Sequence, residues 1–178
     1  TLGPEMKSTG EVIGIGESFE MAYAKSQLAA GQKLPLNGNI FLSVKDKDKP
    51  AILEIAKGFL KLDFKLFASK GTGEFLKKKG IEVEILPKIY ELERPNILDY
   101  IKNNQIDLII NTPSGKKPRK DIFSIRAIAV QRNIPLVTTI PGAKATFLAI
   151  KKMRESPIKV KSIQEYHSDQ TRFGIGGK

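Results

Sequence analysis

Between Asn39 and Met153, short apolar runs alternate with segments of helical periodicity, and this alternation restricts the fold more than any other feature. The apolar runs predict five strands, at 40–44, 65–69, 82–86, 107–111 and 135–139. Five helices are predicted after them, one beginning at Pro50 and the others spanning 72–79, 96–103, 121–131 and 143–153. Continuous apolar runs are typical of a parallel sheet that is covered on both faces. The sequence therefore predicts an α/β fold, a three-layer α/β/α sandwich around a five-stranded parallel sheet.

The residues on either side of this alternation form two further segments. Ser18 suits the N-cap of a helix that runs to Ala30, and Gly31 suits the position after its end. Pro35 and Gly38 then break the chain before the first strand. We therefore expect an N-terminal appendage with one helix at 1–38, the α/β domain at 39–155 and a C-terminal tail at 156–178.

Composition excludes several classes of site. The chain has no cysteine, so disulfides, thiol catalysis and cysteine zinc sites are excluded. Its single histidine, His167, lies in the tail, which excludes a histidine-rich metal centre. No apolar run approaches the ~18 residues that span a bilayer, and no secretion leader opens the sequence. We expect a cytoplasmic protein without a membrane partner.

The chain is strongly basic, with a formal net charge of +11. The excess lies beyond residue 40, and it includes the tract PSGKKPRK at 113–120. Such a charge indicates either an anionic partner or a solvated lysine-rich surface. A nucleotide or another phosphate ester is the favoured partner, because the basic tract lacks the interleaved aromatic residues on which nucleic-acid bases stack.

Polar residues follow the predicted strands at the edge where open parallel sheets bind ligands. The sharpest signal is SKGTG at 69–73, where glycines and a helix N-terminus make a phosphate cradle, although the same pattern is also ordinary helix capping. Lys49, Lys88 and Asn111 are expected on the same rim, and Thr138 and Thr139 follow the last strand. We find no carboxylate pair suited to acid/base catalysis.

Six stretches together resemble a known family. EMKSTGEV at 5–12 is similar to the end of the carbamoyl-phosphate-synthesising half of the large chain of carbamoyl-phosphate synthetase. The other five resemble the C-terminal allosteric domain of that chain, which has the methylglyoxal-synthase-like fold: LSVKDKDK (42–49), FASKGTGEFL (67–76), DLIINTPSGKK (107–117), SIRAIAVQ (124–131) and VTTIPGAKA (137–145). The resemblance covers nearly the whole sequence and implies a flavodoxin-like winding of the sheet.

The resemblance also implies a ligand and its contacts. Family members are regulatory domains that bind nucleoside monophosphates of the UMP or IMP type and, in bacteria, ornithine. Carried over to this sequence, the phosphate contacts are Lys49, Ser69, Thr72, Lys88 and Asn111. The base and ribose contacts are Asp121, Ser124 and Ile125, and Thr138 and Thr139 are the expected contacts for ornithine or the effector.

The family's large chain makes carbamoyl phosphate from bicarbonate, ammonia and two ATP, for pyrimidine and arginine biosynthesis. The resemblance implies that its ATP-grasp sites, with ATP, Mg²⁺ or Mn²⁺ and K⁺, lie upstream of these residues. It implies two partners, the rest of the large chain and the glutaminase small chain. We expect the 178 residues alone to be non-catalytic and without a cofactor. The alternatives are two enzymes of the same fold, methylglyoxal synthase and the inosine monophosphate cyclohydrolase domain.

Overall fold

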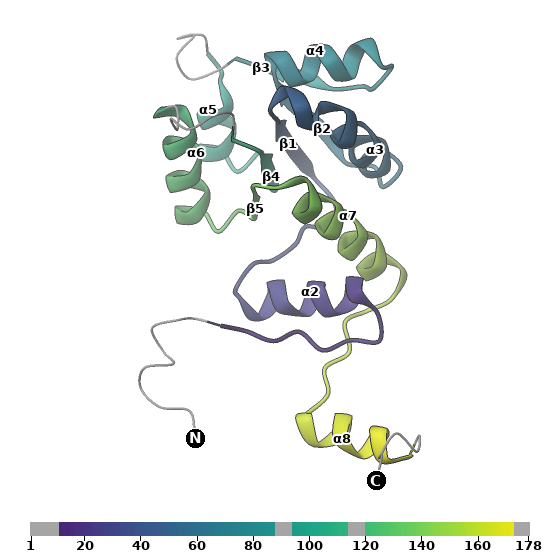
Figure 1. Cartoon of the computed structure of the whole chain (residues 1–178). Helices are drawn as coiled ribbons and strands as arrows, with labels where there is room; N and C mark the ends of the chain where they lie inside the picture. The colour runs from purple at the N-terminus through teal and green to yellow at the C-terminus, as the bar shows by residue number, and fades with distance from the viewer. Residues whose placement is uncertain (1–10, 88–93, 114–119, 173–178) are drawn as a thin grey trace.

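The computed structural model describes residues 11–87, 94–113 and 120–172, and it contains a five-stranded parallel sheet (Figure 1). The strands are β1 (Asn39–Ser43), β2 (Lys65–Ser69), β3 (Glu84–Leu86), β4 (Leu108–Asn111) and β5 (Leu136–Val137). Each pair of neighbouring strands is parallel, and β1 occupies the centre between β2 and β4. The predicted α/β fold class with a five-stranded parallel sheet is confirmed.

The order of the strands is β3-β2-β1-β4-β5. This order differs from the flavodoxin-like winding that the resemblance implies, 2-1-3-4-5, in which β3 lies between β1 and β4. Here β3 lies at the edge of the sheet, beside β2. Each strand is a nearly continuous apolar run, and such runs carry no information about which strand lies beside which. In the observed order the chain reverses direction across the sheet between β1 and β4. Open α/β sheets bind ligands at the carboxyl ends of the strands beside such a reversal.

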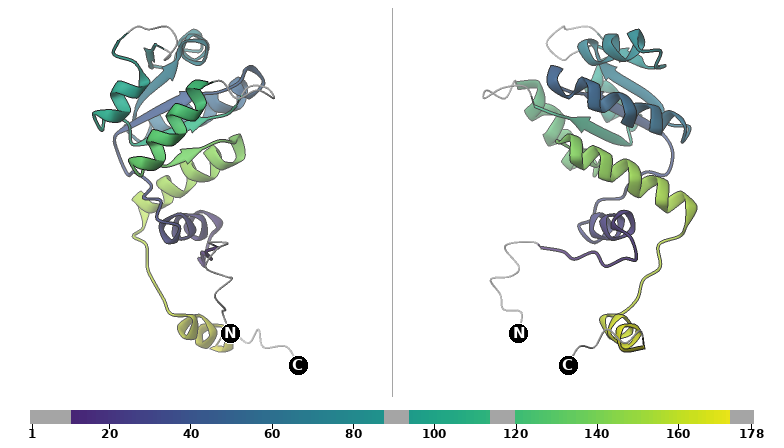
Figure 2. Two further views of the ribbon diagram at one scale, coloured as in Figure 1. Left: turned by 90° about the vertical axis from the view of Figure 1, so that its left-hand side faces the viewer. Right: turned by 45° about the vertical axis from the view of Figure 1, so that its right-hand side comes forward.

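Helices cover both faces of the sheet (Figure 2). The helices of the domain are α3 (Lys49–Leu60), α4 (Lys70–Lys78), α5 (Ile97–Lys102), α6 (Lys120–Gln131) and α7 (Ile140–Glu155), and a short 3-10 helix, η1 (Asp46–Asp48), precedes α3. Ile40 and Leu42 of β1 face a core built with α3, α4 and α7, whereas Phe41 faces a second core built with α5 and α6. The predicted three-layer sandwich is therefore present.

Local sequence explains why these helices begin and pack where they do. In α3, Pro50 lies in the first turn, and Ile52, Ile55 and Phe59 follow at helical spacing and are buried. Fully burying a side chain of this size contributes about 1.5–3 kcal/mol to folding, so the stripe holds α3 on the sheet. At α7, the Thr139 side chain accepts a hydrogen bond from the backbone N–H of Gly142 and caps the helix.

The N-terminal helix α2 (Phe19–Ala29) packs against α7. Ser18 accepts a hydrogen bond from the backbone N–H of Met21, as predicted for its N-cap. Ala24 is buried, and the Tyr23 hydroxyl lies 3.2 Å from Oγ1 of the fully buried Thr146. The appendage is thus attached to the helix layer of the domain, while the boundaries at residues 38 and 155 stay predictions.

The tail contains a helix that the sequence analysis did not expect, α8 (Ile163–Arg172). An extended segment joins it to α7 and carries it away from the sheet (Figure 1). Tyr166 of α8 makes two polar contacts with the N-terminal part, to Lys25 Nζ at 2.8 Å and to the carbonyl of Ile15 at 3.1 Å. Within the described ranges, no helix is both long and apolar enough to cross a membrane.

Candidate functional site

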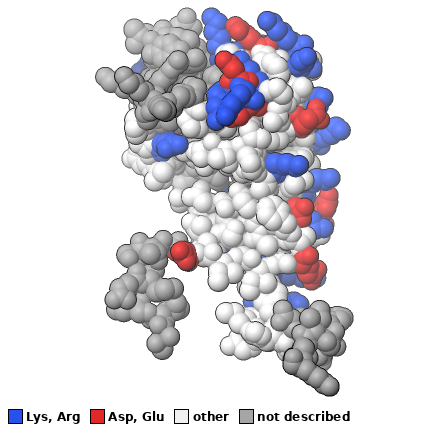
Figure 3. Space-filling model, in the orientation of Figure 1, with Lys and Arg blue, Asp and Glu red and all other residues white. Residues whose placement is uncertain are grey.

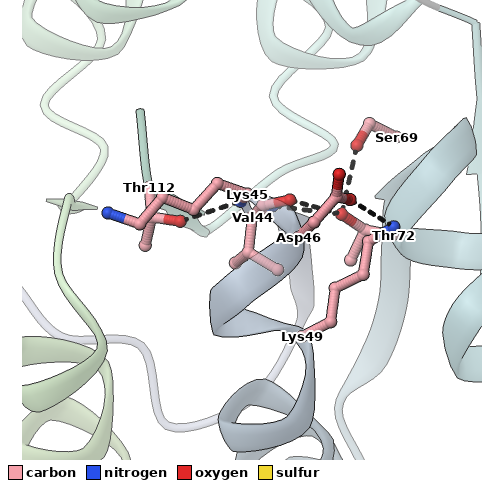
Figure 4. A network of polar contacts seen from close by, with 7 residues as sticks. All are labelled: Val44, Lys45, Asp46, Lys49, Ser69, Thr72 and Thr112. Atoms are coloured by element: carbon pink, nitrogen blue, oxygen red, sulfur yellow. Dashed lines mark hydrogen bonds and ion pairs between the residues drawn. The ribbon is translucent and has the colours of Figure 1, made fainter. Parts of the chain in front are cut away.

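The candidate site lies where the carboxyl ends of β1, β2 and β4 meet (Figure 4). Ser43 at the end of β1 pairs in register with Asn111 at the end of β4, and Ser69 ends β2 on the other side of β1. The residues that leave β1, Val44 and Lys45, therefore pass between polar groups from both neighbouring strands.

Thr72 connects the first turn of α4 to the end of β1. Its hydroxyl oxygen accepts a hydrogen bond from the Val44 backbone N–H at 3.0 Å and another from the Ser69 hydroxyl at 3.4 Å, and it donates to the Val44 carbonyl at 3.4 Å. A hydroxyl has one donor and two acceptor positions, so these contacts use the full capacity of Thr72. Its side chain is almost completely buried, which suits a residue that holds two elements together.

Thr112, directly after β4, holds the end of β1 from the other side. Its backbone N–H donates to the Ser43 carbonyl at 3.0 Å, and its hydroxyl accepts from the Lys45 backbone N–H at 3.1 Å. The two threonines thus hold consecutive backbone N–H groups, those of Val44 and Lys45, from opposite sides. Thr112 is not among the predicted phosphate contacts, although its position directly after a predicted strand already places it on the same rim as Asn111.

The N-terminus of α4 has no side-chain cap. Ser69 is the N-cap residue, but its hydroxyl is directed to Thr72 and makes no capping hydrogen bond. The first N–H groups of an α-helix have no partner within the helix, and a helix N-terminus carries partial positive charge. Gly71 in this first turn has no side chain to cover these N–H groups and is exposed. The turn is therefore suited to bind an oxyanion.

Lys49 lies beside this turn. Its Nζ is 3.8 Å from the point that a Cβ on Gly71 would occupy, and only about a fifth of its side chain is exposed. Nζ also forms an ion pair of 2.8 Å with Oδ1 of Asp46, whose side chain is almost fully exposed. The hydrogen bond from Lys49 and its positive charge hold the pKa of the Asp46 carboxyl below its ordinary value. Asp46 is thus an internal anion at the mouth of the cradle.

The structure brings together three of the five residues predicted to bind phosphate, Lys49, Ser69 and Thr72, at the first turn of α4. Asn111 is buried at the end of β4, on the opposite side of β1 from Ser69. The fifth, Lys88, lies outside the described residues. The basic tract at 113–120 also falls largely outside them, because the described part resumes at residue 120.

The remaining predicted residues lie on two other elements. Asp121, Ser124 and Ile125 belong to α6, on the opposite face of the sheet from α4. Ser124 is exposed, but Ile125 is packed in the core with α5, so its side chain serves packing. The side chain of Asp121 lies outside the described part. Thr138 and Thr139 follow β5, and Thr139 is the N-cap of α7.

The charge distribution favours an anion as ligand. Lys and Arg side chains gather over α4 in Figure 3, with acidic side chains among them, whereas the face over α2 carries few charges. Among the described residues, no group of three or more His, Asp or Glu side chains could hold a metal ion. The cradle offers backbone N–H groups and an ammonium group, which is chemistry for binding an oxyanion.

Comparison with known proteins gives the following relationships. Residues 51–138 match the MGS-like domain family. The chain is 51% identical over 169 residues to the carbamoyl phosphate synthase large chain of Archaeoglobus fulgidus, which covers 94% of this chain and 16% of that protein. It is 48% identical over 172 residues to the carbamoyl phosphate synthase large chain, C-terminal section, of Aquifex aeolicus, which covers 94% of this chain and 32% of that protein.

The chain thus spans between about a sixth and a third of the length of these relatives. Among solved structures, it is similar to methylglyoxal synthase from Elizabethkingia anophelis, with a TM-score of 0.54 over 75% of this chain and 92% of that one. At 18% sequence identity, this likeness concerns the fold alone.

Proposed function

Because residues 51–138 belong to the MGS-like domain family, we propose that the chain is the regulatory domain of a carbamoyl phosphate synthase large chain. The relatives that support this proposal carry that name and are matched over more than nine tenths of the present sequence. In this role the domain binds an effector and controls carbamoyl phosphate synthesis, for pyrimidine and arginine biosynthesis, in the rest of the enzyme.

The proposed effector is a nucleoside monophosphate of the UMP or IMP type. The observation that carries this proposal is the uncapped first turn of α4 beside the Lys49 ammonium group. A phosphate there receives hydrogen bonds from the backbone and a charge-assisted one from Lys49, and Asp46 releases Lys49 as the phosphate arrives. Ser69, Thr72, Lys88 and Asn111 complete the proposed phosphate contacts. Thr72 acts here through its backbone N–H, because its hydroxyl already uses its full hydrogen-bonding capacity.

The base and ribose are proposed to extend from the phosphate toward the N-terminal half of α6, where Asp121 and Ser124 lie. This direction crosses the carboxyl ends of β1 and β4, where the strand order reverses and where open α/β sheets bind their ligands. Thr138 and Thr139 lie beyond β4, after β5, and are proposed as contacts for ornithine or for the same effector.

The chain itself is proposed to be non-catalytic and to need no cofactor, with the ATP, metal-ion and glutaminase chemistry lying in its partners. An apolar hollow between the N-terminal segment, α2 and the tail supports contact with the rest of the large chain. Ile13, Val160 and Ile163 line it and are each more than 60% exposed, which is unfavourable for a surface that stays in water.

Calorimetric titration of the pure chain tests the proposal. UMP and IMP should bind saturably, whereas uridine and inosine, which lack the phosphate, should bind far more weakly. Ornithine is titrated separately and in the presence of UMP. Formation of methylglyoxal or carbamoyl phosphate by the pure chain is measured in parallel, because sustained turnover would favour an enzyme of the same fold. Equal binding of UMP and uridine would overturn the phosphate site.

A further inference from the structure

A second cavity, of about 650 Å³, lies at the edge of the sheet opposite the candidate phosphate site. It is bounded by the segment 32–37 that leads into β1 and by the connections that lead into β4 and β5. Part of α2 and the C-terminal end of α7 line it as well, and the cavity is open to solvent. Its volume falls within the ~300–1,000 Å³ that is typical of pockets for small molecules.

Most of the lining is apolar. Leu34, Ile106 and Pro135 are buried side chains at its floor, one from each of the three connecting segments. Ala24 of α2 is buried as well, and Met153 of α7 adds a flexible apolar wall. A ligand that fills this space must therefore present an apolar body.

Three charged side chains line the cavity, those of Lys33, Arg132 and Asp107. They differ in the groups to which they bind. Oδ2 of Asp107 accepts a hydrogen bond of 2.7 Å from the Asn39 backbone N–H, so this carboxylate holds the start of β1. Arg132 donates from Nη1 to the neutral Asn104 side chain at 3.2 Å. Within the described part of the chain, neither Arg132 nor Lys33 forms an ion pair.

We propose that this cavity binds a small carboxylic acid with an apolar body. The guanidinium of Arg132 keeps donors beyond the one given to Asn104, and its planar fork matches a carboxylate. Lys33 adds a second positive charge from the linker side, and the apolar body lies on Leu34 and Ile106. Such a ligand would contact both the segment 32–37 and the connections that lead into β4 and β5. This site does not depend on the proposed function.

Nuclear magnetic resonance titration of the full chain tests the inference with two probes of one shape, 3-phenylpropionate and its neutral analogue 3-phenylpropanamide. Probes of this size are expected to bind with Kd values on the order of 1 mM. The backbone amide signals of Leu34, Asn104 and Asn133 should shift saturably. The acid should bind about fivefold more tightly than the amide, which corresponds to the upper range for an exposed ion pair.

The preference for the acid should disappear in Arg132→Gln and persist in the control Arg126→Gln, which changes an exposed arginine of α6 outside the cavity. Lys33→Gln changes an exposed lysine of the segment 32–37 and should reduce the preference for the acid over the amide. This variant replaces Arg132→Gln in the test if Arg132→Gln does not fold. Three results would overturn the inference: equal binding of acid and amide, equal loss in both arginine variants, or shifts centred on Ser69 and Thr72.

Discussion

The hydroxyl of Thr72 and the backbone N–H of Val44 are joined by a hydrogen bond of 3.0 Å, which ties the first turn of α4 to the residue after β1. Both residues are buried. Thr72 is also a proposed phosphate contact, so one residue is assigned to architecture through its hydroxyl and to ligand binding through its backbone N–H. The two roles separate experimentally, because stability is measured without the effector.

Replacing Thr72 by Val should lower the free energy of unfolding by about 1–3 kcal/mol, because the buried Val44 N–H loses its acceptor. Thr72→Ser keeps the hydroxyl and should lose less than Thr72→Val. Urea denaturation of the ligand-free chain provides the measurement. If Thr72→Val unfolds at the same urea concentration as the unaltered chain, the hydrogen bond has no role in stability.

Lys49→Ala should weaken UMP binding by about 10- to 150-fold, the range that corresponds to losing one hydrogen bond to a charged group. Lys47→Ala is the matched control, because Lys47 is an exposed lysine of η1 two residues away. Calorimetry at low and high salt should show a smaller difference at high salt, since accessible charges are screened. Similar affinities for the two variants would remove Lys49 from the site.

Gly71 and Gly73 should respond in opposite ways to substitution by Ala. A Cβ on Gly71 meets only Lys49 Nζ, at 3.8 Å, so the fold should stay intact while the methyl group hinders phosphate binding. A Cβ on Gly73 would lie 2.5 Å from Cγ1 of Ile85, so Gly73→Ala should destabilise the fold by about 1–3 kcal/mol. Thermal unfolding and UMP titration of both variants provide the test, and loss of stability in Gly71→Ala would contradict it.

Acid should weaken the contact between β2 and β3 through Glu84. Its carboxylate forms an ion pair of 2.8 Å with Lys65 Nζ and accepts a hydrogen bond of 3.1 Å from the Tyr100 hydroxyl. The hydrogen bond from Lys65 is the main cause that holds the pKa of Glu84 below its ordinary 4.5. The contribution is therefore present above that value and is lost as pH falls through the lower pKa of the folded chain.

The pKa of Lys65 is raised above 10.5, mainly by its hydrogen bond to Glu84, so its contribution is lost only as pH rises beyond that value. Because both side chains are more than 40% exposed, the pair should contribute under about 1 kcal/mol. Glu84→Gln should flatten the acid side of the profile of urea midpoint against pH, and Glu74→Gln, an exposed control on α4, should not. Parallel profiles for both variants would argue against the pair.

Deleting residues 1–38 should leave a folded but less stable domain. None of the five strands lies in this segment, so the sheet should still form. Ala24 and Leu34 belong to its core, however, and Tyr23 contacts Thr146, so unfolding should require less denaturant. Circular dichroism and urea denaturation of 39–178 provide the measurement. Loss of cooperative unfolding would mean that the segment is an integral part of the domain.

The central strands could be predicted from the sequence almost to the residue, because β1, β2 and β4 are buried apolar runs. The strands at the edges were predicted too long, at 82–86 and 135–139, since each has only one neighbour to pair with. Residue 139 leaves β5 for a further reason, because its side chain caps α7. The order of the strands could not be predicted from the sequence, because it depends on which face of the sheet each connecting helix covers and in which direction it crosses the sheet.

The helix α8 could have been predicted from its first residues, which carry a capping signal, but not from the periodicity of apolar residues. Ser162 and Glu165 form a capping box, in which the Ser162 backbone N–H donates to Glu165 Oε2 at 2.6 Å and the Glu165 N–H donates to Ser162 at 3.2 Å. The spacing Ser-x-x-Glu announces such a helix start. Few apolar residues follow it, so the periodicity of apolar residues predicts only a tail.

In the candidate site, residue types and strand ends were enough to predict the convergence of Lys49, Ser69 and Thr72. The contacts of Thr72 and Thr112 with Val44 and Lys45 were not predictable, because they join side chains to backbone groups 28 and 67 positions away in sequence. Such partners depend on the register between strands. A one-residue shift in register would turn the same side chains to the other face of the sheet.

The helix α7 begins directly after its N-cap residue Thr139, beside the carboxyl edge of the sheet. Near its other end, Arg154 donates from Nε to the Leu36 carbonyl at 2.6 Å. Its sixteen residues span about 24 Å, and α2 packs along it. The helix α7 therefore connects the carboxyl edge of the sheet to the opposite edge, where the segment before β1 lies. Thr139 caps the first turn of α7, and Arg154 holds its last turn on Leu36. A double-mutant cycle at Thr139 and Arg154 would therefore measure, as a coupling energy, whether the helix transmits a change from one edge of the domain to the other.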